Sequence, residues 1–574
     1  MYLKELHSQH NKHPWIWTPW DLVRWSIALI YGLIQRVIVL LYKPYPPKSP
    51  ELPNPYGRIA VIGAGLTGIS SAAHAIAHGF DVVIYETNDS VGGIWSHVNS
   101  TSGLQLNSML YRFHPAVLWS RGFPHRDEIL KEITRIWKQY QLEPRTRFNT
   151  PVTSVRRITS PDSQEETDPA KGGHARWVIN DGADGIFDAV IVTVGTCGTP
   201  QWVEFEGMPA GFVEKKKAEQ KRELEKRASA DAPSTDKPTF STEVPSSSSE
   251  EGEGNNSEDK AEKDQNTYQG PILHSSQLDS ADASQLEGKT VVVIGSGASG
   301  VEAVETALAR GADKCIMVAR DDKWIIPRNM FIDVLIAMQP FGRQMPLSFL
   351  WEYFLRLWQY HGIEDLVPAH RGLFEGTPVV NDEFLYHVRA GRCSYIRGDT
   401  LRLTSRGALV NVRSRESRPK DPGEKQEIEG DVVVLATGFE KPDIDFLPED
   451  LFPEQYDRPN LYLQNFSTED WTILLTNSAY QNAIGTVYQH HFTIDTRILL
   501  TLLLDEGARP TPHDMKLWVD VVRFLKRGAK GGAFSFFTYM ELTIWVILFH
   551  ILRPDRLRWL PFIMFGWGVH PRKK

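Results

Sequence analysis

Two segments of the chain share one pattern, in which a short β-branched run meets a glycine-rich turn and then a helix. The first is RIAVIGAGLTGISSAAHAIAHGFDVVIYETN and the second is KTVVVIGSGASGVEAVETALARGADKCIMVARDDKW. Their turns contain Gly63, Gly65 and Gly68, and Gly295, Gly297 and Gly300. The first glycine permits a tight bend, the second lets backbone approach a pyrophosphate, and the third lets helix and strand pack closely. The pattern predicts an α/β protein with two Rossmann-like dinucleotide-binding domains, in which helix N-termini face the phosphates.

The residue that ends the second strand of each unit indicates which nucleotide is bound. VVIYE ends at Glu86, at the spacing of an acid that hydrogen-bonds a ribose hydroxyl. KCIMVAR ends in Arg320, and a guanidinium pairs with the 2′-phosphate that a carboxylate would repel. Asp321 and Asp322 follow at once and leave NAD(H) open as an alternative. We therefore predict FAD at the first loop and NADPH at the second.

Two later strands also end in small residues. FDAVIVTVGTCGTP is predicted to end a strand at Gly195, and GDVVVLATGFEKP to end one at Thr437 and Gly438. Small residues let the backbone lie close to a bound dinucleotide, although a generic strand-to-turn transition explains the same pattern. All three are candidate cofactor contacts.

Five motifs, in order, resemble those of the flavin-containing monooxygenase family, within the class B flavoprotein monooxygenases. GAGLTG resembles its FAD loop, VGGIW (Val91 to Trp95) its GG-x-W motif, and YQGPILHS its FxGxxxHS linker, with Tyr268 in place of phenylalanine. GSGASG resembles the NADPH loop, and LATGF resembles the late ATG-containing strand. The resemblance covers roughly residues 58–503, apart from a polar insertion.

The resemblance implies a reaction. NADPH reduces FAD, and the reduced flavin takes O2 to form a C4a-hydroperoxide. That species oxygenates nitrogen or sulfur in a small organic substrate, or attacks a ketone in a Baeyer–Villiger reaction. Leu278 stands four positions after the linker histidine, where Baeyer–Villiger members usually carry tryptophan, so the reaction subtype stays open.

The resemblance also assigns residues. Gly92, Gly93 and Trp95 join the first loop at FAD, and His274 in the linker is a hinge or cofactor-domain contact rather than an acid or base. Asn107, in LQLNSMLYRF, matches an asparagine near the flavin and nicotinamide, although an asparagine capping a turn is the alternative.

Other function classes have less support. The net charge of −8 gives no basic footprint for nucleic acid. Cys197, Cys315 and Cys393 form no CxxC pair, which disfavours a disulfide reductase and a zinc site. A membrane-associated NAD(P)H dehydrogenase that reduces a quinone shares both loops and remains the main rival. A non-catalytic flavoprotein that scaffolds at a membrane is the second alternative.

Apolar runs lie near both ends of the chain. WSIALIYGLIQRVIVLLY (Trp25 to Tyr42) approaches the length of a membrane span, but Gln35 and Arg36 interrupt it. A second apolar region consists of FSFFTYMELTIWVILFHIL (Phe534 to Leu552) and WLPFIMFGW. We predict membrane association at both ends, spanning or interfacial, with the catalytic part facing the cytosol, as at the endoplasmic reticulum. A helix packed on the core is the alternative. FLWEYFLRLW, at residues 349–358, is predicted to be core or membrane-facing rather than a substrate pocket.

At 574 residues the chain should divide into several domains. A polar insertion opens with VEKKKAEQKRELEKR, which is compatible with a short solvated helix, and is otherwise predicted to be disordered. His490 with His491, and His7, His10 and His13, are not predicted to bind a metal, and we expect no metal site. The oligomeric state is not predicted. The predicted division is 1–43 membrane segment, 44–56 proline-rich linker, 57–207 FAD domain, 208–267 insertion, 268–440 NADPH domain, 441–530 FAD-domain return and 531–574 membrane segment.

Overall fold

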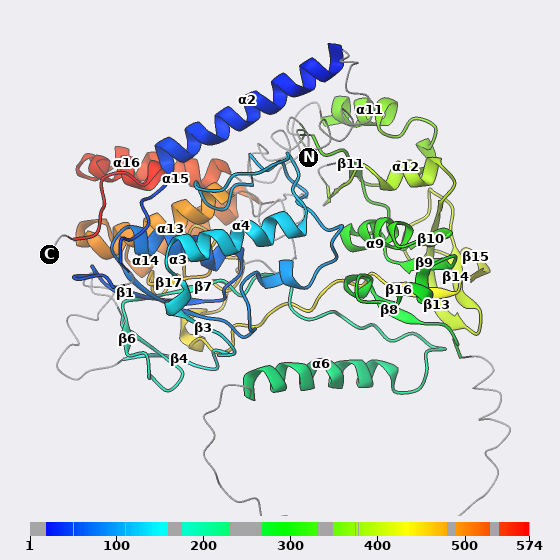
Figure 1. Cartoon of the computed structure of the whole chain (residues 1–574), viewed down its shortest axis with the longest axis horizontal. Helices are drawn as coiled ribbons and strands as arrows, with labels where there is room; N and C mark the ends of the chain where they lie inside the picture. Colours follow the sequence, from blue (N-terminus) through cyan, green and yellow to red (C-terminus); the bar gives the residue numbers. More distant parts are fainter. Residues whose placement is uncertain are drawn as a thin grey trace, which may run out of the picture.

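The computed structural model describes residues 19–49, 51–109, 111–158, 175–229, 267–329, 332, 348–373, 375–376, 378–478, 489–527 and 539–572. Figure 1 shows two α/β units side by side, with helices of both chain ends over the first. Most of the predicted insertion and the histidines His7, His10 and His13 lie outside the described residues, as do the side chains of His490 and His491.

The first unit is built on a five-stranded parallel sheet with strand order β17-β7-β1-β2-β3. Its strands are β1 (Arg58–Ile62), β2 (Asp81–Tyr85), β3 (Thr146–Arg147), β7 (Ala189–Val192) and β17 (Ile473–Leu474). Its helices are α3 (Leu66–Ala77), α4 (Arg126–Gln139), α13 (Gln489–Leu504), α14 (Pro512–Leu525), α15 (Tyr539–Ile551) and α16 (Leu560–Phe565). A three-stranded antiparallel sheet, β4 (Val155–Arg157), β5 (Trp177–Ile179) and β6 (Ile186–Phe187), is inserted before β7. The edge strand β17 therefore comes from the chain that follows the second unit.

The second unit is built on a seven-stranded sheet with strand order β15-β14-β13-β10-β9-β16-β8. Its strands are β8 (Ile272–His274), β9 (Thr290–Ile294), β10 (Lys314–Ala319), β13 (Cys393–Thr404), β14 (Gly407–Val412), β15 (Glu424–Glu429) and β16 (Val432–Leu435). Its helices are α8 (Ala283–Leu286), α9 (Ala298–Ala309), α11 (Ser348–Trp358) and α12 (Phe384–Arg389), with a small parallel pair, β11 (Ile325–Ile326) and β12 (Val379–Val380). Cys315 and Cys393, distant in the sequence, lie opposite each other on β10 and β13 as buried free thiols.

The central strands show why the glycine-loop segments fold in this way. In β1 and β9 every residue after the first is buried, because helices cover one face of each sheet and antiparallel strands, β4–β6 in the first unit and β13–β15 in the second, cover the other. The predicted Rossmann-like α/β class is confirmed. The strands end slightly earlier than expected, at Tyr85, Val192, Ala319 and Leu435, because the chain turns away from the sheet edge there. Glu86, Gly195, Arg320, Thr437 and Gly438 consequently lie in the turns that follow the strands rather than within them.

The polar insertion begins with a helix, α6 (Phe212–Ser229). Its first turn is anchored to the second unit, since Val213 is buried and the Phe212 ring lies 5.7 Å from that of Trp202. Further along, Lys216 and Glu219 form an ion pair at 2.9 Å. The short helix expected from VEKKKAEQKRELEKR is thus present, and disorder in the rest of the insertion stays a prediction.

The two apolar ends behave differently. Within the described residues, α2 (Pro19–Tyr42) is the one helix long and apolar enough to cross a membrane, and 6% of its Trp25–Tyr42 window is buried. By contrast, α15 buries Leu542, Trp545, Val546 and Phe549 in the core of the first unit. One face of the C-terminal apolar region therefore packs on protein, and its association with a membrane stays a prediction.

Candidate functional site

The first glycine loop is a cradle that side chains would fill. Gly63 has a φ of +105°, and a Cβ there would lie 2.8 Å from the carbonyl oxygen of Thr193. A Cβ on Gly68, in the first turn of α3, would overlap the carbonyl oxygen of Gly63. Glycine is therefore required at both positions, at the first by its backbone conformation and at both by close approach. Gly65 caps α3, whose first N–H groups have no partner within the helix.

The second glycine pair lies directly against this loop. Gly92 and Gly65 form a bridge, and the Gly92 N–H donates to the carbonyl of Ala64 at 3.1 Å. Gly93 has a φ of +57°, and a Cβ there would lie 3.0 Å from Cα of Gly65. Trp95 follows in a short 3-10 helix (Gly93–Ser96) and packs, half-buried, on the core of the first unit. The structure thus brings together the GAGLTG and VGGIW motifs, which the sequence predicts for one cofactor.

Glu86 supports the same loop. It is 6% exposed, and its Oε2 accepts a hydrogen bond from the Ala64 N–H at 2.7 Å. Its Oε1 accepts from the backbone and side-chain amides of Asn88 at 2.9 and 2.8 Å. A carboxylate offers about four acceptor sites, so Glu86 retains capacity for a ribose hydroxyl while it holds the loop.

The turns after β7 and β16 join the two units. The Gly198 N–H donates to the Glu440 carbonyl at 2.7 Å, and the Gln201 N–H donates to the Gly438 carbonyl at 2.9 Å. Gly195 and Gly438 have φ values of +80° and +84°, and a Cβ on either meets nothing within 4 Å. These two glycines are needed for their backbone conformation and leave open space beside them. The Thr437 hydroxyl donates to the Gln201 carbonyl in the same crossing.

His274 connects the linker to the turn after β16 by hydrogen bonding. Its ring is fully buried, Nε2 lies 2.9 Å from the Gly438 carbonyl oxygen, and Nδ1 lies 2.8 Å from the Ser276 hydroxyl. Burial lowers the pKa of His274 to about 4, so the ring is neutral at pH 7 and Nε2–H donates to Gly438. Both ring nitrogens are engaged by protein, and any influence of His274 on a cofactor passes through Gly438. Leu278, four residues on, is buried in the core of the second unit.

The second glycine loop repeats the first. Gly295 has a φ of +119°, and a Cβ there would lie 2.6 Å from the Ala436 carbonyl oxygen. A Cβ on Gly300 would overlap the carbonyl oxygen of Gly295. Gly297 caps α9, and the nearest atom to a Cβ there is Nζ of Lys323, at 3.7 Å.

Lys323 is a functional candidate that sequence reasoning missed. Its ammonium lies at the N-terminus of α9, beside the glycine loop that the sequence predicts to bind a pyrophosphate. Burial, with the neighbouring Arg371, lowers the pKa of Lys323, and Asp321 opposes that effect. The sequence feature that could have identified Lys323 is its position just past the end of the second strand, in ARDDKW.

An arginine-rich cavity of about 230 Å³ lies at the end of β10. Its lining includes Arg320, Arg371, Arg397, Arg413, Arg415 and Arg418, together with Asp321, Asp322 and His370. The two aspartates that left the sequence prediction open are neutralised. Asp321 pairs with Arg371 at 2.8 Å, and Asp322 pairs with Arg397 at 2.8 Å.

The remaining arginines give the cavity its charge. Arg413 pairs with Asp399 at 3.0 Å. Among the residues that the structure describes, no carboxylate lies within ion-pair distance of the guanidinium groups of Arg320, Arg415 or Arg418, although the Arg418 backbone N–H donates to Asp421 at 2.7 Å. Arg320 is exposed at this cavity, where its guanidinium can reach an incoming anion. Excess positive charge here suits a phosphate, because guanidinium groups bind phosphate oxygens with paired hydrogen bonds.

A loop of the first unit contacts α9 of the second. Asn99 donates to the Ser275 carbonyl at 2.7 Å, and the hydroxyls of Thr101 and Thr306 lie 2.6 Å apart. Ser102 donates to Glu302 on α9. Burial raises the pKa of Glu302 to about 8, and that of Glu305 to about 7. No sequence pattern indicates that these two carboxylates are withdrawn from solvent, because a glutamate on a helix is usually solvated.

Asn107 lies in the continuation of that loop. Its Oδ1 accepts from the Met109 N–H at 2.9 Å, which is an Asx turn. The turn-capping alternative therefore describes its local geometry, and a role in catalysis stays a proposal.

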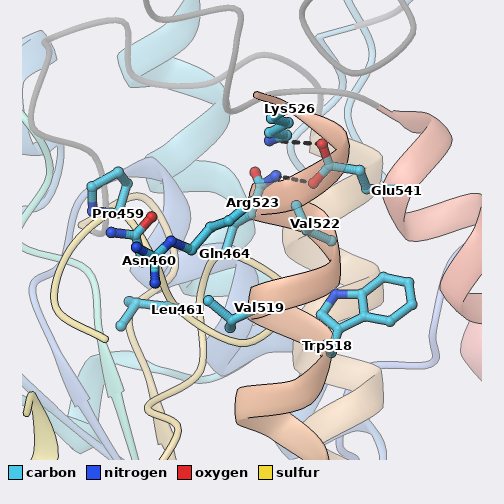
Figure 2. Close-up of a pocket in the computed structure, with 10 residues that line it drawn as sticks. All are labelled: Pro459, Asn460, Leu461, Gln464, Trp518, Val519, Val522, Arg523, Lys526 and Glu541. Atoms are coloured by element: carbon cyan, nitrogen blue, oxygen red, sulfur yellow. Dashed lines mark hydrogen bonds and ion pairs between the residues drawn. The ribbon is translucent and has the colours of Figure 1, made fainter. Parts of the chain in front are cut away.

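A separate cavity of about 300 Å³ lies beside α14 (Figure 2). It is lined by Pro459, Asn460, Leu461, Gln464, Trp518, Val519, Val522, Arg523, Lys526 and Glu541. Lys526 and Glu541 pair at 2.6 Å, and Gln464 donates to the same carboxylate. No residue of either glycine loop lines it, and we assign it to neither cofactor.

Comparison with known proteins gives two family matches. Residues 61–133 match the model of the NAD(P)-binding Rossmann-like domain, and residues 260–472 match that of the flavin-binding monooxygenase-like family. A putative flavin-containing monooxygenase 2 of Arabidopsis thaliana is 27% identical over 47% of this chain and 52% of its own length. Flavin-containing monooxygenase 5 of Oryctolagus cuniculus is 23% identical over 67% of this chain and 62% of its own.

Solved structures agree in fold. An ε-caprolactone-bound cyclohexanone monooxygenase matches with a TM-score of 0.55 and 15% identity, over 86% of this chain and 97% of that one. The chain spans about half the length of the curated relatives it matches, with 38%, 52% and 45% of the first three covered. The two loops and the linker thus lie in the regions that the two family models match, and residues 260–472 are similar to the flavin-binding monooxygenase-like family.

Proposed function

We propose that the chain is an FAD- and NADPH-dependent monooxygenase that inserts one atom of O2 into a small organic substrate. The observation that carries this proposal is the pair of glycine cradles, each at the carboxyl end of an inner strand of its sheet, β1 and β9. The second of them lies in a unit whose β10 ends in the arginine-rich cavity. Nucleotides bind at this edge of open α/β sheets.

Different residues of the chain bind different parts of the two nucleotides. The N-termini of α3 and α9 receive the two pyrophosphates, and Glu86 receives a ribose hydroxyl of FAD. Lys323 adds charge at the second pyrophosphate. Arg320, with Arg415 and Arg418, receives the 2′-phosphate of NADPH. Bound FAD, once reduced by NADPH, supplies the chemistry that activates O2.

The candidate residues without direct geometry toward a reacting atom have positioning roles in this proposal. His274 holds the turn that contains Gly438, and Gly195 lies in the turn after β7, whose later residues Gly198 and Gln201 bond to the turn after β16. Asn107 stays a candidate for the nicotinamide side of the flavin. The substrate class, an amine, a sulfide or a ketone, follows from the family resemblance.

The proposal includes the domain division predicted from the sequence. An FAD domain formed by residues 57–207 and 441–530 is supported by β17, which extends the first sheet. An NADPH domain formed by residues 268–440 is supported by β8, which extends the second sheet. We also propose attachment to a membrane, with the catalytic part facing the cytosol, as at the endoplasmic reticulum, supported by the exposed apolar surface of α2.

The cofactor assignment is tested with Arg320→Ala. The variant loses a charge-assisted contact of about 1.5–3 kcal/mol, so kcat/KM for NADPH should fall about tenfold to hundredfold while that for NADH stays unchanged. Arg156→Ala, a change of another arginine exposed on β4, is the matched control. Equal losses with both nucleotides would contradict the 2′-phosphate contact.

The reaction is tested with a panel of amines, sulfides and ketones. A true substrate should stimulate NADPH consumption in air and gain one oxygen atom from 18O2, as read by mass spectrometry. NADPH oxidation that depends on an added quinone, proceeds under argon and leaves every panel compound unoxygenated would instead establish the rival dehydrogenase.

A further inference from the structure

Helix α2 exposes apolar side chains over most of its length. Eleven large apolar residues are exposed, among them Ile27 at 56%, Leu33 at 58% and Leu40 at 83%. The full set is Leu22, Val23, Trp25, Ile27, Leu29, Ile30, Leu33, Ile34, Val37, Leu40 and Leu41. Soluble monomers rarely present a contiguous apolar patch of this extent without a partner for it.

The exposed side chains cover more than half of the helix circumference. At about 100° per residue, they form one continuous arc, and Arg36, also exposed, lies at its border. A flat protein surface contacts a narrower stripe of a helix than this, whereas fluid acyl chains can surround a wide arc. An arginine at the border can extend its charged end to lipid headgroups while its stem stays on the apolar side.

The opposite face of α2 is fixed to the first unit by polar contacts. The Gln35 side chain is 2% exposed, and it donates to the Trp119 carbonyl at 2.9 Å and accepts from the Trp119 N–H at 2.8 Å. The Tyr31 hydroxyl donates to the Arg121 carbonyl at 3.1 Å. At the end of the helix, the rings of Tyr42 and Trp567 stack at 6.0 Å.

These contacts hold α2 lengthwise on the protein. A helix that crossed the bilayer on its own would have to release Gln35 and carry Arg36 into hydrocarbon, where a central arginine costs about 2.5–3.5 kcal/mol on insertion scales. The geometry therefore favours a helix that lies along the membrane surface.

A second apolar helix belongs to the same side of the molecule. Helix α11 exposes Phe349, Tyr353, Phe354, Leu357 and Trp358, each by more than half. Figure 1 shows α2 and α11 along the upper edge of the view, where the N-terminal end of α2 reaches toward α11. Aromatic side chains are enriched where proteins meet the membrane–water boundary.

We propose that α2 and α11 form one membrane-facing surface that seats the chain on a single leaflet of a phospholipid bilayer, with α2 in the membrane plane. Helix α11 belongs to the second unit, so both units touch the membrane. This inference does not depend on the oxygenation reaction, and its tests measure membrane binding alone.

The first test is flotation of the full FAD-loaded chain with phosphatidylcholine vesicles. Phe354→Glu and Trp358→Glu, both on α11, should each weaken vesicle binding about tenfold or more, because each removes from the lipid contact a large aromatic side chain that the protein leaves exposed. Ile186→Glu is the matched control, since Ile186 is exposed on β6 at the opposite edge of Figure 1 and should bind as the parent does. Flavin content measured on every variant separates loss of binding from loss of fold.

Three outcomes would overturn the proposal. Unchanged binding of both α11 variants would show that α2 alone is the anchor. A doubled mass by light scattering, without vesicle binding, would show that a second copy covers the surface. Fluorophores placed singly at positions 23, 30 and 37 provide the third test. Quenchers placed at a shallow depth in the lipid should quench all three fluorophores equally. If the label at position 30 instead lies deeper than the labels at positions 23 and 37, the helix crosses the membrane.

Discussion

Replacement of His274 by phenylalanine should produce a stability defect that disappears as the pH falls. At pH 7 the variant keeps the ring volume but loses two hydrogen bonds of His274, one to the Gly438 carbonyl, which keeps the bond from the Gln201 N–H, and one to the Ser276 hydroxyl; at about 1 kcal/mol each, their loss costs about 2 kcal/mol. The parent has its own pH dependence, because burial lowers the His274 pKa from 6.5 to about 4. A neutral buried histidine stabilises the fold above pH 6.5, and that stability is lost as the pH falls toward 4, since the unfolded chain binds the proton first.

The magnitude at pH 5 follows from the same shift. The pH then lies about 1.5 units below the ordinary histidine pKa, and each unit corresponds to about 1.36 kcal/mol, so the parent loses about 2 kcal/mol relative to pH 7. A phenylalanine side chain binds no proton, so the variant does not lose this stability between pH 7 and pH 5. The difference in free energy of unfolding between the parent and His274→Phe should therefore decrease from about 2 kcal/mol at pH 7 to near zero at pH 5.

Equilibrium urea unfolding of the FAD-loaded chain, followed by tryptophan fluorescence at both pH values, measures this gap. His513→Phe, at an exposed position on α14, is the control and should show the same gap at both. A His274→Phe gap that is equal at pH 7 and pH 5 would refute the neutral, hydrogen-bonded histidine on which the reasoning rests.

Two further predictions concern the glycine cradles. Gly68→Ala should abolish FAD retention, because its Cβ would overlap the Gly63 carbonyl, while Gly32→Ala, at an open helical position on α2, should retain flavin absorbance; a flavin-loaded Gly68→Ala protein would contradict the cradle. Lys323→Ala should raise KM for NADPH and NADH alike by about tenfold, because both nucleotides carry the pyrophosphate. Steady-state kinetics would distinguish it from Arg320→Ala, and a change confined to NADPH would move Lys323 to the 2′-phosphate.

Local patterns predicted the parts of the protein that local physics determines. The Rossmann-like class and the tight turns at Gly63 and Gly295 follow from a glycine spacing that has one structural use. The prediction failed where distant segments meet. Nothing near Asp321 or Asp322 in the sequence indicates that Arg371 and Arg397 neutralise them.

The same limit applies elsewhere. Lys323 lies beside the second glycine loop only because the chain after β10 folds next to that loop. Glu302 is covered by a loop of the other unit, which is distant in the sequence. Apolar composition alone could not separate the partly buried α15 from the exposed α2, since the difference depends on which face finds a protein partner.

The edge strand β17 has a consequence for synthesis on the ribosome. The second sheet is assembled from one continuous stretch that ends at β16, whereas β7 of the first sheet lacks its neighbour until residues 473–474 have emerged. The second sheet can therefore close while the first still presents an unpaired edge. An unpaired strand edge can pair with other chains, so the first sheet is open to aggregation during synthesis until β17 has paired with β7.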